Sequence, residues 1–290
     1  MLHRVKLTTS VFDKAFNREA SQYLGLSIQL SLNGFSFCVL DPAQMKYLAL
    51  ESRELNNSTN YQDISQLIPE IVQSSDLLGL PYESIKIIIE THKSTLIPHP
   101  FFDPLKAKEN LSLLFNPGKG DSPSDDYLPL LEARNVWFVN DELRKTIARF
   151  FPLASVHHHG SVLIESLLAS SKNTDQGIGV YVYVRKTWFD IVVLKDDKLL
   201  FYNSFRYTAG EDFIYYLIYV LEQLNLDPES IMLRMLGEVL RISEIYDITR
   251  KYVRNVSFGD RPAGFRYSYV FDQIPGHYYF NLLNHYHCEL

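Results

Sequence analysis

LSIQLSLNGFSFCVLD, residues 26–41, is the stretch of the chain that decides its fold. Apolar side chains alternate with polar ones on both sides of Asn33-Gly34, a pair that strongly indicates a hairpin because both residues accept a positive φ. A further turn over 41–44 leads into a third apolar run. The pattern therefore predicts an antiparallel meander of three strands over residues 26–50, with a type I′ turn at Asn33-Gly34.

A helix and a buried strand follow the meander. Apolar residues at helical spacing over 64–78 predict a helix that stops before Gly79 and Pro81. The run Ile85–Ile89 is short, apolar and rich in β-branched residues, which indicates a strand buried on both faces.

The same order of elements returns in the second half of the chain. The run VYVYVRKTWFDIVVLKDDKLLFYNSF at 180–205 predicts a second meander, and residues 26–40 align with 180–194 at a constant offset of 154 residues. A predicted helix follows, and LDPESI at 226–231 matches LPYESI at 80–85. The sequence therefore predicts two copies of one unit, each a meander, a helix and a strand.

Extra material separates the two copies. Residues 116–127 are polar and rich in Gly, Pro and Ser, which predicts a mobile surface loop. A second polar stretch at 170–177 predicts the domain boundary, giving domains 1–174 and 175–290. Hydrophobic patterning predicts strands over 135–139 and 153–156 and helices over 141–151 and 160–170.

Composition narrows the class of protein. The 290 residues are 46% hydrophobic, which excludes a fully disordered chain, and the net charge of −6 argues against a general nucleic-acid binder. Two cysteines cannot form a disulfide framework, and no apolar run has the length of a signal peptide or a membrane span. We therefore expect a globular cytoplasmic protein.

The two meander-led units resemble the actin-like ATPase fold shared by actin, the 70-kDa chaperones, sugar kinases and the pilus assembly protein PilM. Together with the C-terminal stretch FDQIPGHYYFNLL at 271–283, they make the chain resemble DUF3822, a family of uncharacterised bacterial proteins. The resemblance implies an α/β fold of two ribonuclease-H-like subdomains that face a nucleotide cleft. Each would hold a mixed sheet led by a three-stranded antiparallel meander, with flanking helices.

In the resembled fold, the first hairpin of each half supplies a phosphate loop, built from glycines and small hydroxyl residues, with an acidic residue that holds the metal ion. The first loop here contains Asn33 and Gly34, with no aspartate on the strand leading in. The second loop carries Arg185, Lys186 and Thr187 where the fold has glycines after an aspartate. Long side chains at these positions would occupy the volume of the phosphates.

Two further positions match the fold in part. Asp190 corresponds to a later aspartate, although on a hairpin strand it can equally be a solvated face residue, and Gly237 with Glu238 retains one of the paired glycines of the adenosine segment. Because all three nucleotide elements are degraded together, the sequence predicts a pseudo-ATPase with no catalytic residues and no required cofactor. A nucleotide or Mg-ATP held by the charge of Arg185 and Lys186 stays open as an alternative.

If catalysis is lost, the hairpins and the cleft are available to a protein partner. Trp188, placed in the second turn, and Arg185 belong to the residue types that dominate interface energies, although Trp188 can instead fold back over its own hairpin. The candidate cleft or partner-binding residues are Asn33, Gly34, Arg185, Lys186, Thr187, Trp188, Asp190, Gly237 and Glu238. The expected partner is an unidentified cytoplasmic protein or a second copy of the chain.

Two other functions stay open from the sequence. One is a divergent nucleotide-binding ATPase or kinase of the same superfamily. The other, less favoured, is an RNA- or DNA-associated accessory protein that uses a local basic cluster, namely Arg241, Arg250, Lys251, Arg254, Arg261 and Arg266.

Histidines cluster at two places without predicting a metal site. Three consecutive histidines, 157–159, cannot all face one metal ion from a strand or a helix, so we expect solvent-facing or capping side chains. His285 and His287 have strand spacing, but no second ligand pair lies near them in the sequence.

Overall fold

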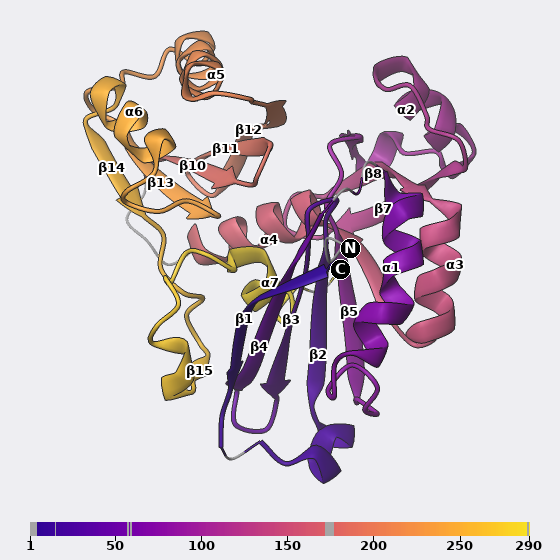
Figure 1. The fold of residues 1–290 in the computed structure, drawn as a ribbon. Coiled ribbons are helices and arrows are strands. Elements are labelled where there is room, and N and C mark those ends of the chain that lie inside the picture. The colour runs from indigo at the N-terminus through magenta and orange to yellow at the C-terminus, as the bar shows by residue number, and fades with distance from the viewer. Residues whose placement is uncertain (1–4, 15, 57, 59, 172–176, 289) are drawn as a thin grey trace. The chain divides into compact units, whose positions relative to one another are not determined.

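The computed structural model describes residues 5–14, 16–56, 58, 60–171, 177–288 and 290, which form two compact units (Figure 1). Unit 1 comprises Met1–Val162, Ala263–Gln273 and Leu282–Leu290, and unit 2 comprises Leu163–Pro262 and Ile274–Asn281. The predicted boundary between residues 174 and 175 lies outside the described residues. The predicted domains 1–174 and 175–290 differ from these units, because the chain returns to unit 1 near its C-terminus.

Unit 1 is built on a mixed sheet in the order β1-β4-β3-β2-β5-β9, with β15 also pairing with β4. The meander strands are antiparallel, whereas β5 pairs in parallel with β2, and β9 with β5. The strands are β1 (Val5–Phe12), β2 (Gly25–Leu30), β3 (Gly34–Asp41), β4 (Lys46–Leu55), β5 (Ser84–Ile89), β9 (Ser155–His158) and β15 (Arg266–Tyr267).

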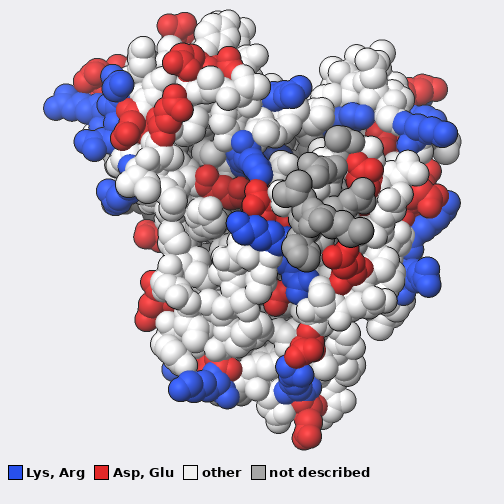
Figure 2. Space-filling model, in the orientation of Figure 1, with Lys and Arg blue, Asp and Glu red and all other residues white. Residues whose placement is uncertain are grey.

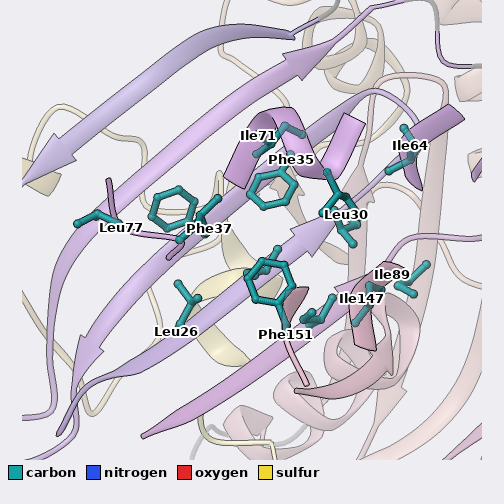
Figure 3. Packing of buried hydrophobic residues seen from close by; sticks show 14 of the residues in the cluster. Leu26, Leu30, Phe35, Phe37, Ile64, Ile71, Leu77, Ile89, Ile147 and Phe151 are labelled. Carbon is teal, nitrogen blue, oxygen red and sulfur yellow. The ribbon is translucent and has the colours of Figure 1, made fainter. Parts of the chain in front are cut away.

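Helices α1 (Tyr61–Gln73) and α3 (Asp141–Phe150) cover one face of this sheet. The alternation of apolar residues in the meander determines which face of the sheet the helices cover. Every second side chain of β2 and β3 packs against Ile64, Ile71 and Ile147 of the helices (Figure 3). Asn60 and Asp63 form a capping box that starts α1, and Asn140 caps α3. Two further α-helices, α4 (His159–Ser171) and α7 (Phe280–Asn284), each have residues in both units. Short 3-10 helices are η1 (Arg18–Tyr23) and η4 (Tyr269–Phe271).

An insertion in unit 1 forms a small second sheet in the order β6-β8-β7, from β6 (Ser94–Pro98), β7 (Asp121–Leu128) and β8 (Ala133–Asn140), with η2 (His99–Phe101), η3 (Pro104–Lys106) and α2 (Ala107–Leu114) beside it. The prediction of a mobile loop over 116–127 is wrong for its larger part, because residues 121–128 pair with β8 along their whole length. The polar composition of residues 116–127 suggested a loop, but β7 is an edge strand, and an edge strand tolerates Pro123 and polar side chains.

Unit 2 repeats the arrangement of unit 1. Its sheet has the order β12-β11-β10-β13-β14, with an antiparallel meander and then two parallel strands. The elements are β10 (Ile178–Val184), β11 (Trp188–Lys195), β12 (Lys198–Arg206), α5 (Gly210–Gln223), β13 (Met232–Gly237), α6 (Glu244–Tyr252) and β14 (Asn255–Phe258).

The two copies agree in detail. β11 has the bounds of β3 shifted by 154 residues, and each meander contains a register irregularity at the same place, between Val39 and Leu40 and between Val193 and Leu194. The predicted repeat of meander, helix and strand is therefore confirmed. No helix among those that the structure describes is long and apolar enough to cross a membrane.

The predicted type I′ turn at Asn33-Gly34 is wrong. Neither residue has a positive φ, and the N–H of Ser31 donates to the carbonyl of Gly34, so Leu32 and Asn33 are the central residues. The left-handed pair lies instead between β11 and β12, at Asp196 and Asp197, with φ of 48° and 62°.

The C-terminal segment 282–290 belongs to unit 1 and bonds to strands of its sheet. Tyr47 donates from its hydroxyl to the carbonyl of Leu283 at 2.6 Å. The Lys86 ammonium donates to the carbonyls of His285, Tyr286 and Cys288 at 2.9–3.2 Å. One cation thus serves three carbonyls at the end of the chain, and a hydrogen bond from a charged donor is worth about 1.5–3 kcal/mol.

Replacing this donor should loosen the C-terminal segment. We expect Lys86→Met to lower the free energy of unfolding by about 1.5–3 kcal/mol in urea titrations, since carbonyls of the segment lose a charged donor. The two buried thiols, Cys38 and Cys288, should then react faster with a thiol reagent. Lys106→Met, at an exposed lysine, is the matched control and should change neither quantity. Equal behaviour of the two variants would contradict the anchoring role.

Candidate functional site

The second hairpin, between β10 and β11, is closed by backbone and side-chain bonds. The N–H of Arg185 donates to the carbonyl of Trp188 at 2.9 Å, which leaves Lys186 and Thr187 exposed at the tip. The Tyr207 hydroxyl donates to the carbonyl of Arg185 at 2.6 Å, and burial raises the pKa of Tyr207 to about 12. Trp188 is the fourth residue of this turn, as Gly34 is in the first hairpin. It begins β11 opposite Arg206 and is half-buried.

Arg185 and Asp190 form a buried ion pair in this hairpin. The guanidinium Nη2 lies 2.9 Å from Asp190 Oδ1, and the two side chains are 9% and 0% exposed. The Ser204 hydroxyl on β12 donates to the same carboxylate oxygen. Asp190 is therefore not a solvated face residue, and Arg185 is not a surface residue that a partner could reach. The register explains both corrections. Asp190 lies opposite Tyr183, and Arg185, two residues after Tyr183, is on the same face of the hairpin and reaches Asp190 diagonally.

The first copy contains a neutral counterpart of this arrangement. Under the 154-residue offset Ser36 corresponds to Asp190, and its hydroxyl lies 2.8 Å from that of Ser52 on the neighbouring strand. Ser31, the counterpart of Arg185, bonds within its own turn to Gly34 and Asn33. The cross-strand hydrogen bond is thus common to both copies, and the ion pair is an addition in unit 2.

Gly237 ends β13 beside the second hairpin. Its φ is +80°, and a Cβ at this position would lie 2.3 Å from the carbonyl oxygen of Val184, so only glycine fits without a shift of the backbone. The N–H of the exposed Glu238 donates to that same carbonyl at 2.8 Å. Packing between the parallel strands β10 and β13 thus accounts for Gly237.

His277 also belongs to this region, although it is not among the candidate residues selected from the sequence. Its carbonyl accepts from the N–H of Gly237 at 2.8 Å, and its ring nitrogen Nε2 lies 2.7 Å from the carbonyl of Val239. The ring stacks on Phe258, and burial lowers the pKa of His277. No local pattern indicates it, because its contacts come from residues 19 to 40 positions earlier in the chain.

In unit 1, Asn33 and Gly34 lie in a hairpin whose backbone carbonyls accept hydrogen bonds from other backbone groups of the meander. The carbonyl of Asn33 accepts from the N–H of Leu55 at 2.8 Å, and the carbonyl of Gly34 accepts from the N–H of Ser31 at 2.9 Å. The four residues of this turn, 31–34, include no carboxylate. The structure thus brings the predicted residues 185, 190 and 237 together within unit 2, while 33 and 34 belong to unit 1.

The three consecutive histidines are buried in unit 1, so the expectation of solvent-facing side chains is wrong. His158 is bonded at both ring nitrogens: Nε2 to the carbonyl of Thr91 at 2.7 Å, and Nδ1 to the N–H of Gly160 at 3.0 Å. The capping alternative is correct for this residue, because Gly160 lies in the first turn of α4.

A polar network surrounds these histidines. Asp126 accepts from the N–H of His158 and the hydroxyl of Ser161, and Asn135 donates to Ser161. His285 packs edge-on against His157, and burial holds the pKa of His285 well below its ordinary value. Within the described ranges, no three His, Cys, Asp or Glu side chains are grouped to hold a metal ion.

The proposed basic cluster is divided by the structure. Arg266 belongs to unit 1, whereas the other five residues belong to unit 2. Arg254 pairs with Glu229, Arg241 lies over the ring of Phe258, and Arg250 over that of Tyr246. On the face drawn in Figure 2, Lys and Arg side chains alternate with Asp and Glu instead of forming one broad basic area.

Comparison with known proteins places the chain within a described fold. A family model for a protein of unknown function, DUF3822, matches residues 13–256. A Bacteroides thetaiotaomicron VPI-5482 protein, described as having an actin-like ATPase fold and unknown function, superposes with a TM-score of 0.75 at 23% identity, over 84% of this chain and 93% of its own. The PilM–PilN type IV pilus biogenesis complex superposes with a TM-score of 0.58 at 11% identity, over 90% and 96%. No curated protein matches the chain. The predicted actin-like fold class is confirmed.

The buried ion pair should behave as a unit. We expect Arg185→Met to lower the free energy of unfolding by about 3–5 kcal/mol, because it leaves the Asp190 carboxylate buried beside an apolar side chain. The double variant Arg185→Met/Asp190→Asn should recover much of that loss in urea titrations. Lys186→Met, at the exposed neighbouring position, is the control and should be nearly neutral. A single Arg185 variant as stable as this control would show that the pair contributes nothing.

Proposed function

The chain belongs to the DUF3822 family, and we propose that it is a non-catalytic member of the actin-like fold, a pseudo-ATPase that acts by binding another protein. The observation that carries this proposal is the Arg185–Asp190 ion pair. The strand that leads into this hairpin has no aspartate for a metal ion, so Asp190 is the only carboxylate in residues 183–190 that could hold the metal ion accompanying the phosphates. Here that carboxylate already has a permanent cation.

Recruiting Mg²⁺ to Asp190 would have to displace Arg185 or place two cations side by side. Displacement would leave a guanidinium uncompensated in a buried site, which costs about 3–5 kcal/mol. Keeping the guanidinium in place would hold a positive charge 2.9 Å from the oxygen that a metal ion needs. Both routes oppose the binding of a metal–nucleotide complex at this hairpin.

The backbone of the hairpins supports the same conclusion. A phosphate loop offers several N–H groups that point at the anion, and glycines let the anion approach closely. Residues 185–188 contain no glycine, and the N–H of Arg185 is used by Trp188 within the hairpin. In the first hairpin the N–H of Ser31 is likewise used by Gly34.

A divergent nucleotide-binding protein is the second candidate, and one observation favours it. Lys186 is exposed at the tip of the second hairpin, where its ammonium could meet a phosphate without a metal ion. This alternative requires binding by charge alone and predicts no turnover.

Protein binding is the function that such a fold can retain without catalysis. Lys186 and Thr187 are exposed at the hairpin tip, and the half-buried Trp188 lies beside them. We place the partner in the cytoplasm, where the buried thiols of Cys38 and Cys288 would stay reduced.

Nucleotide binding can be measured directly. We expect ATP or ADP with Mg²⁺ to leave the melting temperature unchanged and phosphate release to stay at background, because the metal carboxylate at the strand end is absent and Asp190 is paired with Arg185. Arg185→Gly/Lys186→Gly should not restore turnover. Magnesium-dependent phosphate release that is lost in a folded Asp190→Asn variant would refute the proposal. A melting shift with nucleotide alone, abolished by Lys186→Ala, would favour the second candidate.

Trp188 is the proposed anchor of the hairpin, and the other tryptophan, Trp137, provides a matched control. Trp137 is fully buried, so Trp137→Ala should lower the free energy of unfolding by about 3–5 kcal/mol. Trp188→Ala should cost less than about 1.5 kcal/mol while abolishing co-purification of the partner. If Trp188→Ala destabilises the protein as much as Trp137→Ala does, Trp188 covers its own hairpin and is not an anchor.

A further inference from the structure

The outer edge of β12 differs from its counterpart in the first copy. In unit 1 the corresponding strand, β4, is covered along its length: β1 pairs with residues 49–55, and β15 pairs with residues 46 and 47. In unit 2 β12 pairs with β11 on one side, and no strand of the described residues pairs with its other side. An uncovered edge presents backbone donors and acceptors that another chain can use.

We propose that β12 is the docking strand for an extended segment of the partner, which joins the sheet of unit 2 beside Lys198–Arg206. The proposal rests on the protein-binding function above and names the surface that performs it. β1 shows that this repeat accepts such a strand, since it pairs antiparallel with β4 over Val5–Phe12.

The helix that packs beside this edge is also more apolar on its exposed face in unit 2 than in unit 1. The exposed residues at helical spacing on α1 are all polar. The exposed residues at the same spacing on α5 include two tyrosines. The tyrosines Tyr215 and Tyr219 are 63% and 48% exposed. The rows are Gln62, Gln66, Glu70 and Gln73 on α1, and Glu211, Tyr215, Tyr219 and Glu222 on α5.

Aromatic rings connect this helix face to the docking strand. Phe205 of β12 stacks on Tyr216 at 5.0 Å between ring centroids, Tyr216 contacts Tyr215 at 5.3 Å, and Tyr215 stacks on Tyr219. Leu200 of β12 is 48% exposed. Exposed apolar side chains that adjoin an uncovered strand edge are typical of a binding surface and are costly to leave in water.

The charges at the ends of β12 favour a segment of another protein over a second copy of this chain as the added strand. Lys198 and Arg206, both exposed, lie at the two ends of β12. Pairing two copies of β12 antiparallel would set Lys198 against Arg206 at both ends, and parallel pairing would set each residue against itself. Like charges placed opposite each other destabilise a sheet. The occupant we infer is therefore an extended segment of another protein, with apolar side chains at every second position and carboxylates near its ends.

One hydrogen bond within β12 is also consistent with an edge that can accept another strand. The N–H of Ser204 donates to the side-chain oxygen of the preceding residue, Asn203, at 2.9 Å. This exposed bond satisfies a donor on β12 within its own strand, and a carbonyl of the added segment can replace it.

A displayed library of random linear peptides, selected on the full-length protein, tests the proposal without knowledge of the partner. We expect enriched peptides to alternate apolar residues and to carry Asp or Glu near their ends. A synthetic enriched peptide should increase the hydrogen-exchange protection of residues 198–206. The same peptide with N-methyl groups on alternate residues should bind at least about tenfold more weakly, because it cannot complete the sheet.

Variants of the surface then separate the docking strand from the rest of the molecule. Leu200→Lys, and separately Tyr215→Ser/Tyr219→Ser, should weaken peptide binding by about tenfold or more while leaving the melting temperature nearly unchanged. Gln66→Ser/Glu70→Ser, the same row on α1, is the matched control and should bind the peptide normally.

Each other result overturns a defined part of the proposal. Peptide or partner binding that survives both β12 and α5 variants would place the surface elsewhere and leave the protein-binding function standing. A dimer in light scattering that Leu200→Lys dissociates would make the occupant a second copy. No enriched peptide, together with no partner recovered by full-length protein, would reject the docking strand and the protein-binding function together.

Discussion

Parallel pairing of the first meander strand with the strand after the helix is the constraint on which both units depend. β2 pairs with β5, and β10 with β13. Parallel neighbours need a crossover, so α1 and α5 must each span one face of the sheet. The same pairing brings the carboxyl ends of the two strands to one edge, which is why Gly237 lies against Val184 beside the second hairpin.

Burial then decides what the residues at that edge can do. Asp190 is fully buried on β11, where an isolated carboxylate would be costly, and Arg185 compensates its charge from just beyond the end of β10. The corresponding places in the first copy hold Ser31 and Ser36, and the cross-strand contact there is neutral. The two copies thus fill the same place with different chemistry, a buried ion pair in unit 2 and a neutral hydroxyl contact in unit 1.

The two copies also differ in how their outer edges are covered. β1 and β15 cover β4, whereas the described chain leaves the outer edge of β12 without a strand. The strands that cover β4 lie toward the two ends of the chain, β1 at residues 5–12 and β15 at 266–267. The separate segment 282–290 is held by Tyr47 and Lys86, which donate to its carbonyls. The two copies therefore have similar cores and different edges, because a core depends on its own periodicity and an edge depends on which other segments of the chain pair with it.

The order of the elements and their repetition follow from the amino-acid pattern alone, since alternation with period two and helical spacing are local properties that a folded sheet preserves. The resemblance to the actin-like fold also selected Arg185, Asp190 and Gly237, among nine candidate residues. Tertiary contacts were needed to establish that Arg185 neutralises Asp190, that residues 121–128 form a strand, that 157–159 are buried and that residues 282–290 return to unit 1. These outcomes depend on partners far away in the chain, such as Ser204 for Asp190 and β8 for β7. A side chain's charge and exposure are set by such partners, and no local pattern contains them.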